Sequence, residues 1–184
     1  MRYLLFFVLA TLTACTTPTL DLLNNQTWQP TGQANWRYAG KQLVGTVTDG
    51  AEGAMITTQS YENFDFQVEF QPDSTVNSGV FVRCQGRAID FKSCYEFNIW
   101  DFNPNQTYRT GAVVLRAEPL AQVNSVGQWN TYRVLAKGNH LQAWVNGTMV
   151  ADLTDDELMG GYIGLQASGD GEIRFRNAKL QPLQ

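Results

Sequence analysis

Residues 77–101 read NSGVFVRC, then QGRAIDFKS, then CYEFNIWD, and the two outer blocks alternate between apolar and other side chains. A period of two is typical of a strand with one buried face. The sequence therefore predicts two strands, Gly79–Cys84 and Cys94–Trp100, joined by a short polar loop. Ionisable and amide side chains stand next to an aromatic within these strands. That combination indicates a face that binds a ligand rather than a surface that only meets solvent.

The remainder of the chain follows the same pattern of short alternating segments between turn residues. Lys137–His140 and Asn146–Gly147 have the composition of tight hairpin turns, and only Asp152–Leu158 reads as a helical turn. Many antiparallel strands without a long helix predict an all-β fold, a jelly-roll sandwich of two antiparallel sheets. The other predicted strands are Gln42–Val47, Ala54–Thr58, Phe64–Phe70, Gly111–Arg116, Asn130–Ala136, His140–Val145, Gly161–Gln166 and Glu172–Leu180.

The N-terminus has the features of a processing signal. Arg2 supplies a positive charge, and the apolar run Leu4–Leu12 is too short to cross a bilayer as a helix. The run ends in LTAC at residues 12–15, which resembles a bacterial lipobox. In a lipobox the chain is cut before the cysteine, and the cysteine receives lipid. The alternative is an ordinary secretory signal in which Cys15 has no special role.

Lipid on Cys15 predicts a protein anchored to the bacterial cell envelope without a membrane-spanning segment. Residue 16 is Thr and not Asp, which by resemblance to enteric sorting rules predicts the outer membrane. The part after the signal is long enough for one well-buried domain. The expected organisation is a signal peptide at residues 1–14, a polar tether at 15–25 and a single domain at 26–184.

The remaining cysteines agree with an exported protein, and the charge argues against one class of partner. The net charge is −4 and the chain has no Lys/Arg cluster, which argues against nucleic acid as a partner. Cys84 and Cys94 lie at facing ends of neighbouring predicted strands and predict a disulfide. Closing a loop of about ten residues contributes roughly 2–3 kcal/mol. The alternative interpretation is a metal site formed by the same two thiols, which has little support because no His or further Cys lies nearby in the sequence.

Few residues offer catalytic chemistry. The only histidine, His140, follows a hairpin turn, so a Ser-His-Asp mechanism has little support. Glu96, Asn98 and Trp100 share one face of their predicted strand, about 6.6 Å from one to the next. Because Asn98 can neither attack a sugar nor donate a proton as an acid, hydrolysis by two carboxylates is disfavoured. Proximity of Arg83 to Glu96 would lower the pKa of the carboxyl, and a purely structural ion pair between the two is an alternative.

Seven motifs, taken in order, resemble the 3-keto-disaccharide hydrolase domain family, long catalogued as a domain of unknown function. The resemblance runs from about Trp36 to Leu180. Each motif is short, and their order along the chain is what makes the resemblance specific. They are NSGVFVR at 77–83, YEFNIWD at 95–101, TGA at 110–112, GQWNTY at 127–132, WVNG at 144–147, GYIGLQ at 161–166 and FRN at 175–177.

The resemblance implies a concanavalin A-like jelly roll that breaks the glycosidic bond of sugars oxidised at C3. A C3 ketone acidifies the C2 hydrogen, so a base can remove it, the glycosidic oxygen leaves by elimination, and water adds at C1. By this resemblance Glu96 or Asp101 is the base, and Arg83 stabilises the enolate. The implied substrate-binding residues are Asn77, Asn98, Trp100 and Gln166.

The chain departs from the family pattern at one point. Many relatives carry a His between the acidic strand and the TGA motif, whereas residues 101–106 contain none. No cofactor and no metal-binding residue is therefore predicted, and a divalent metal is left open.

Two further functional classes stay open beside the enzyme. A non-catalytic carbohydrate-binding jelly roll would bind an oligosaccharide without turnover. A structural envelope lipoprotein would show no sugar-dependent thermal shift.

Overall fold

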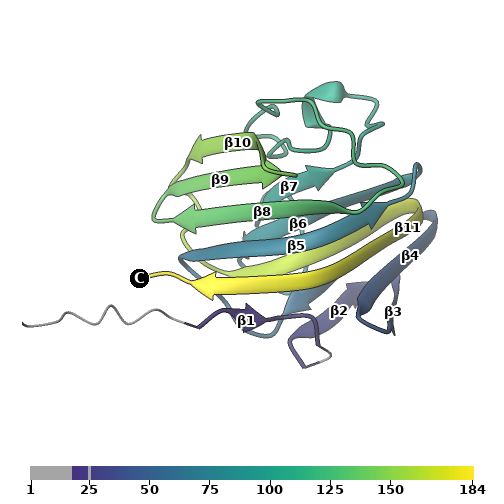
Figure 1. The fold of residues 1–184 in the computed structure, drawn as a ribbon, viewed down its shortest axis with the longest axis horizontal. Helices are drawn as coiled ribbons and strands as arrows, with labels where there is room; N and C mark the ends of the chain where they lie inside the picture. Colours follow the sequence, from purple (N-terminus) through teal and green to yellow (C-terminus); the bar gives the residue numbers. More distant parts are fainter. Residues whose placement is uncertain (1–17, 25) are drawn as a thin grey trace, which may run out of the picture.

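The computed structural model describes residues 18–24 and 26–184, and these residues form eleven strands and one short 3-10 helix (Figure 1). Within the same residues, no helix is long and apolar enough to cross a bilayer. The elements are β1 Leu20–Asp21, β2 Trp28–Gly32, β3 Asn35–Ala39, β4 Gln42–Thr57, β5 Phe64–Pro72, β6 Val76–Cys84, β7 Tyr95–Ile99, η1 Gln106–Tyr108, β8 Asn130–Lys137, β9 His140–Val145, β10 Thr148–Thr154 and β11 Tyr162–Pro182.

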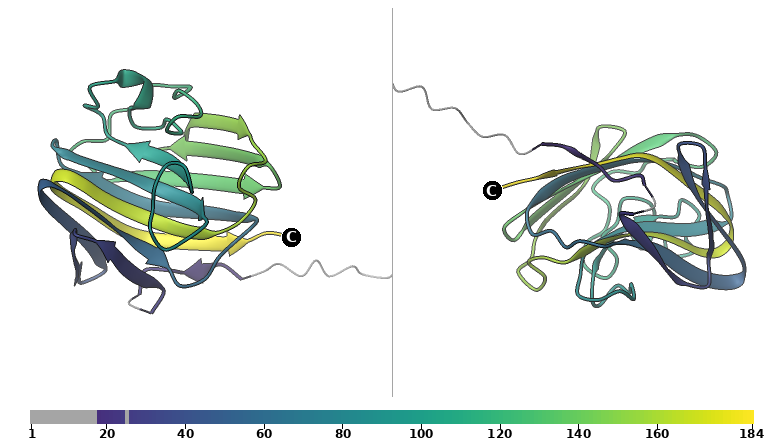
Figure 2. Two further views of the ribbon diagram at one scale, coloured as in Figure 1. Left: turned by 180° about the vertical axis from the view of Figure 1, so that it is seen from behind. Right: turned by 90° about the horizontal axis from the view of Figure 1, so that it is seen from below.

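The strands form two antiparallel layers that share β4 and β11 (Figures 1 and 2). The front layer runs β10-β9-β8-β5, followed by the C-terminal half of β11, the N-terminal half of β4, and β3. The back layer runs β7-β6, followed by the N-terminal half of β11, the C-terminal half of β4, and β2. The predicted all-β sandwich of antiparallel strands is confirmed.

Glycines allow β4 and β11 to bend from one layer into the other. Gly50, Gly169 and Gly171 have φ values of 73°, 82° and 112°, which residues with a Cβ rarely adopt. The pairing of β11 with β4 shifts register between Gly169 and Gly171, as expected of a β-bulge. The prediction of two separate strands along each of these stretches is wrong, because the backbone pairing continues where the side-chain alternation breaks. β4 joins the predicted 42–47 and 54–58, and β11 joins 161–166 and 172–180.

The core lies between the layers and is built from the inward side chains of both. β5 contributes Phe64, Phe66, Val68 and Phe70, all fully buried, as their shared face in the sequence predicts. On the opposite side of the core, alternate side chains of β6 and β7 in the back layer pack against them. Each such burial contributes roughly 1.5–3 kcal/mol relative to exposure. The buried residues that β6 and β7 contribute include Val80, Val82, Tyr95, Phe97 and Ile99.

Two predicted elements differ from the structure. Gly111–Arg116 is an irregular segment beside β7: Val114 N donates to Glu96 O, and the chain then turns at Leu115, where φ is 61°. The predicted helical turn at Asp152–Leu158 is also wrong. The turn at Asn146–Gly147 instead forms a hairpin and places β10 against β9. β2 and β3, which we did not predict, are short strands that pair with β4.

The N-terminal part of the domain begins earlier than the sequence predicts. Leu20 and Asp21 pair with Leu180 and Lys179 of β11, so these residues belong to the fold and not to a tether. Leu22 is buried, and its carbonyl accepts a hydrogen bond of 2.6 Å from the Trp28 indole. Cys15 and the predicted signal peptide lie outside the described residues.

Candidate functional site

A cleft of about 270 Å³ lies on the outer face of the back layer. Its floor consists of residues that point outward from four neighbouring strands, β7, β6, β11 and β4. At Gly79 on β6, a Cβ would come within 3.3 Å of Glu96 Cγ and 3.2 Å of the Phe81 ring. The absence of a side chain at Gly79 therefore allows Glu96 and Phe81 to lie close against the backbone of β6. The cleft is lined by Glu52, Asn77, Phe91, Glu96, Asn98, Trp100, Asn103, Tyr108, Val114, Gln166 and Ser168.

Glu96 is the buried ionisable group of this cleft. Its side chain lies on the face of β7 away from the core, yet only 7% of the residue is exposed. Among the described residues, none donates a hydrogen bond to its carboxylate. Burial, and then the negative charge of Glu52, raise the pKa of Glu96 to about 7. A carboxyl with this pKa can donate or accept a proton near neutral pH.

Two amide side chains offer unused hydrogen-bonding atoms to the cleft. Gln166 Nε2 donates to Glu52 Oε1 at 2.7 Å, which fixes the orientation of the amide. Gln166 Oε1 is then buried without a hydrogen-bond partner among the residues that the structure describes, and so is Asn77 Oδ1. Buried polar atoms in native proteins are normally hydrogen-bonded, so these two acceptors suit the hydroxyl groups of a ligand.

Asn98 holds one wall of the cleft in place. Its Nδ2 donates to Tyr108 O, and its Oδ1 accepts from Ile99 N. The same carbonyl of Tyr108 accepts from Asn103 Nδ2 at 3.0 Å. Next along the chain, Trp100 N donates to Thr110 Oγ1 at 2.9 Å. These bonds fasten the loop after β7 and place the Trp100 side chain at the cleft.

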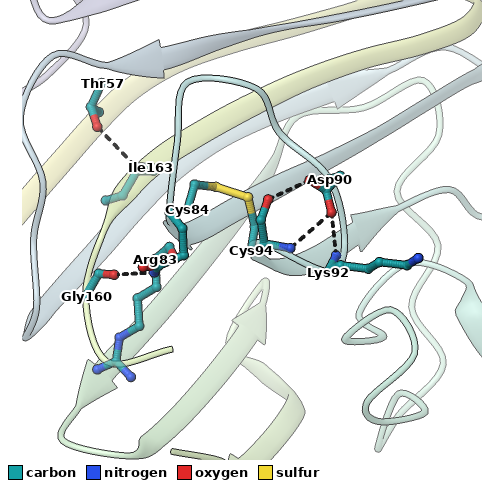
Figure 3. Close-up of a disulfide and its surroundings, with 10 residues drawn as sticks. Thr57, Arg83, Cys84, Asp90, Lys92, Cys94, Gly160 and Ile163 are labelled. Carbon is teal, nitrogen blue, oxygen red and sulfur yellow. Dashed lines mark hydrogen bonds between the residues drawn. A yellow bond between two sulfur atoms is a disulfide. The ribbon is translucent and has the colours of Figure 1, made fainter. Parts of the chain in front are cut away.

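The opposite wall depends on the disulfide. Cys84 and Cys94 are bonded, with their Cα atoms 4.2 Å apart, which confirms the predicted pair (Figure 3). The loop that they close packs on the outer face of the back layer, where Ile89 covers Phe81 and Gly164. Inside the loop, Asp90 accepts hydrogen bonds from Lys92 N and Ser93 N. The disulfide therefore fixes the position of the loop that contains Phe91, and Phe91 lines the cleft.

The expected proximity of Arg83 to Glu96 is wrong. Arg83 has a φ of 56°, and the pairing of β6 with β11 shifts register there, so the alternation of β6 breaks and Arg83 does not line the cleft. Figure 3 shows its side chain extending away from the disulfide. The fully buried guanidinium donates to three backbone carbonyls, at 2.6 to 2.9 Å. The carbonyls belong to Glu62, Gly138 and Leu158. The expected lowering of the Glu96 pKa is also wrong, since that pKa is raised.

Asp101 also lies outside the cleft. Both of its carboxylate oxygens accept hydrogen bonds, from Thr110 Oγ1, Ser125 N, Ser125 Oγ and Val126 N, at 2.5 to 3.1 Å. The carboxylate therefore ties the end of β7 to the segment before β8. This geometry corrects the expectation that Asp101 and Glu96 serve one site, because Asp101 instead borders a separate cleft.

The structure thus brings five of the predicted site residues into one cleft and leaves Arg83 and Asp101 elsewhere. Six lining residues were not predicted. Glu52 stands in the glycine-rich stretch 49–53, which reads as a turn. Its spacing of two from Ala54 and of four from Ile56 is the signal that could have placed it on the outward face. The missed residues are Glu52, Phe91, Asn103, Tyr108, Val114 and Ser168.

Metal-ligating side chains are sparse in the part of the chain that the structure describes. No group of three or more His, Cys, Asp or Glu side chains is gathered there. His140 lies on the β9–β10 hairpin, where its Nε2 is 2.6 Å from an oxygen of Asp152. This exposed pair is not part of the cleft lining.

A jelly-roll sandwich with a polar, aromatic-walled cleft on one sheet face is an architecture suited to carbohydrate ligands. Comparison with protein families supports this assignment to carbohydrate ligands. The family described as the 3-keto-alpha-glucoside-1,2-lyase-like domain matches residues 20–181. The chain belongs to this family.

Solved structures show the same fold. A presumptive glycosyl hydrolase from Parabacteroides distasonis ATCC 8503 is 25% identical, with a TM-score of 0.76 over 90% of this chain and 100% of that one. The carbohydrate-binding module CBM66 from Bacillus subtilis is 18% identical, with a TM-score of 0.62 over 85% and 97%. The Bacillus licheniformis β-glucanase is 13% identical, with a TM-score of 0.65 over 94% and 100%. No curated protein matches the chain.

Proposed function

We propose that this protein cleaves glycosides whose sugar has been oxidised to a ketone at C3. Family membership supports a reaction of this kind, and the similar P. distasonis protein is described as a presumptive glycosyl hydrolase. The observation that carries the proposal is Glu96. A buried carboxyl without a hydrogen-bond donor among the described residues, with its pKa raised to about 7, is poised for proton transfer.

The proposed reaction is an elimination followed by a hydration. Loss of the C2 proton forms an enolate with the C3 ketone, and the glycosidic C1–O bond then breaks as the C1=C2 double bond forms. The departing oxygen takes up a proton and leaves as an alcohol. Water then adds its oxygen to C1 and a proton to C2, which yields the free 3-keto sugar.

Two acceptor atoms of the cleft that have no partner among the described residues support binding of a sugar there. Asn77 Oδ1 and Gln166 Oε1 would accept hydrogen bonds from ring hydroxyls. Trp100 and Phe91 line the cleft and offer apolar surface to the faces of a sugar ring. A volume of about 270 Å³ admits a ligand of roughly one sugar unit at a time.

The decisive experiment follows the C2 proton. The protein is incubated in D2O with a 3-keto-glucoside, and release of 3-keto-glucose is measured together with deuterium at C2. We expect turnover with deuterium incorporation beyond that of a sample without enzyme. Glu96→Gln should reduce turnover by roughly 10²-fold or more, whereas the exposed Glu118→Gln serves as a matched control. Turnover without deuterium at C2 would refute the elimination, and wild-type activity of Glu96→Gln would refute the role of Glu96.

A binding module without catalysis is the second candidate. The unpartnered amide oxygens of Asn77 and Gln166 favour it, since ligand hydroxyls alone satisfy them. Its expected result is a rise in melting temperature with an unoxidised oligosaccharide, together with no product from a 3-keto-glucoside.

We also propose that the domain is held at the bacterial outer membrane by lipid on Cys15. The lipobox-like sequence at 12–15 supports this. Since the folded part begins by Leu20, the chain between the lipid and the domain would be only a few residues long.

A further inference from the structure

Glu52 is a second carboxylate at the cleft that holds Glu96. It stands on the C-terminal half of β4, where it pairs with Ser168 of β11. Its side chain accepts the hydrogen bond of 2.7 Å from Gln166 Nε2. In the strand order of the back layer, β4 and β7 are separated by β11 and β6. Glu52 and Glu96 therefore approach the cleft from opposite sides of its floor.

The two carboxylates have contrasting surroundings. Glu52 is exposed at the rim, and one of its carboxylate oxygens accepts a hydrogen bond from the Gln166 amide. Glu96 is buried without a donor from the described residues, and the charge of Glu52 adds to the cost of ionising it. Among the residues that line the cleft, none is Lys, Arg or His. The other titratable groups near Glu96 are Tyr108 at the cleft and the buried Tyr132 on the core side.

We propose that Glu52 and Glu96 act as an acid–base pair that shares one proton across the bound sugar, with Glu52 as the base and Glu96 as the acid. This inference rests on the proposed function. Two carboxyl groups in one cleft, one buried and one exposed, are a common arrangement for such a division of roles.

The pair accounts for both proton transfers of the elimination. The Glu52 carboxylate takes the proton from C2, and the electron pair of that bond passes through the enolate to form the C1=C2 double bond. The C1–O bond breaks, and its electron pair stays on the glycosidic oxygen. Glu96 gives its proton to that oxygen, so the aglycone leaves as a neutral alcohol.

The hydration returns both groups to their starting states. After the elimination Glu96 is ionised and Glu52 is protonated. Glu52 is exposed to solvent, so its proton exchanges with water before the hydration. Glu96 then takes a proton from the water whose oxygen adds to C1, and Glu52 gives a solvent-derived proton to C2. The net reaction consumes one water and needs no oxidant, reductant or further co-reactant.

Glu52→Gln provides the direct test, because the Gln side chain keeps an oxygen that can accept from Gln166 Nε2. With a 3-keto-glucoside, the wild type should show a bell-shaped dependence of kcat on pH, since the base must be ionised and the acid protonated. Glu52→Gln should lower kcat by roughly 10²-fold, change KM by less than about threefold, and lose the acidic limb. Glu118→Gln, an exposed Glu away from the cleft, should behave as wild type.

A second measurement separates the pair from the proposed reaction. The Glu96 carboxyl is titrated by ¹³C NMR in the protein with Glu52 and in Glu52→Gln, without any substrate. Its midpoint should fall in the variant, because the charge of Glu52 has been removed. An unchanged midpoint, or a Glu52→Gln enzyme with wild-type kcat and pH profile, would overturn the pair. A wild type inactive on every 3-keto-glucoside, with the midpoint still falling, would overturn the proposed function and the catalytic use of the pair, but not its electrostatic coupling.

Discussion

Replacing Glu96 with Gln is expected to stabilise the domain at alkaline pH and to leave its stability nearly unchanged at acid pH. Burial, with a further contribution from Glu52, raises the pKa of this carboxyl from 4.5 to about 7. Below pH 4.5 the group is protonated in both the folded and the unfolded chain, so its ionisation does not change the free energy of unfolding there. Between pH 4.5 and 7 only the unfolded chain ionises, so the stability of the wild type falls as pH rises.

The size of the effect follows from that change in proton affinity. At about 1.4 kcal/mol for each tenfold change, ionising Glu96 in the folded protein costs roughly 3 kcal/mol once the pH is above 7. Gln is neutral and nearly the same shape, so it escapes this cost. For a domain of this size the gain corresponds to a rise in melting temperature of about 6–12 °C.

Urea and thermal unfolding near pH 5 and near pH 8.5 provide the measurement. Glu96→Gln should be more stable than the wild type at the higher pH, and the difference should shrink towards the lower pH. The control Glu118→Gln should stay within about 0.5 kcal/mol of the wild type at both. A stability difference that does not depend on pH would show that Glu96 is not held protonated by the fold.

Four other changes test features described above. Gly79→Ala should fold but weaken sugar binding at least about tenfold, measured by titration calorimetry, because its Cβ would crowd the Glu96 side chain and displace it; unchanged affinity would mean that the position of Glu96 does not matter for binding. Asp101→Asn should lower the free energy of unfolding by roughly 2 kcal/mol in urea, since a charged acceptor of four hydrogen bonds is lost. Arg83→Lys should lower the free energy of unfolding by about the same amount, because one ammonium cannot reach three carbonyls as the planar guanidinium does. Full activity per folded molecule would agree with the position of Arg83 outside the cleft. Cys15→Ser should release the protein from the membrane fraction, and continued retention there would argue against lipidation.

Much of the fold could be predicted from local sequence pattern. Period-two alternation is a property of each strand by itself, so it correctly placed β5, β6 and β7 and the face that carries Glu96, Asn98 and Trp100. The disulfide could be predicted from the same two strands and from the expectation that the protein is exported. The motif order then identified the family, which no single strand could have done.

The errors arose where the backbone departs from regular geometry or where distant segments meet. At Arg83 a residue with positive φ breaks the alternation of β6, and alternation was the only guide to its direction. Asp101 is held by backbone groups of Ser125 and Val126, far away in the sequence, which local pattern does not reveal. Glu52 was missed because glycines that bend a continuous strand resemble glycines that end one.

The bent strand β11 couples the stability of the two layers of the domain. One half of it contributes Gln166 and Ser168 to the site, and the other half buries Ile173 and Phe175 in the core. Because a single strand is hydrogen-bonded into both layers, neither layer can open widely without loosening the other. Amide protons in both halves should therefore exchange with solvent through a shared opening. A sugar bound on the back layer would then slow hydrogen exchange in the front layer as well, in strands that it never contacts.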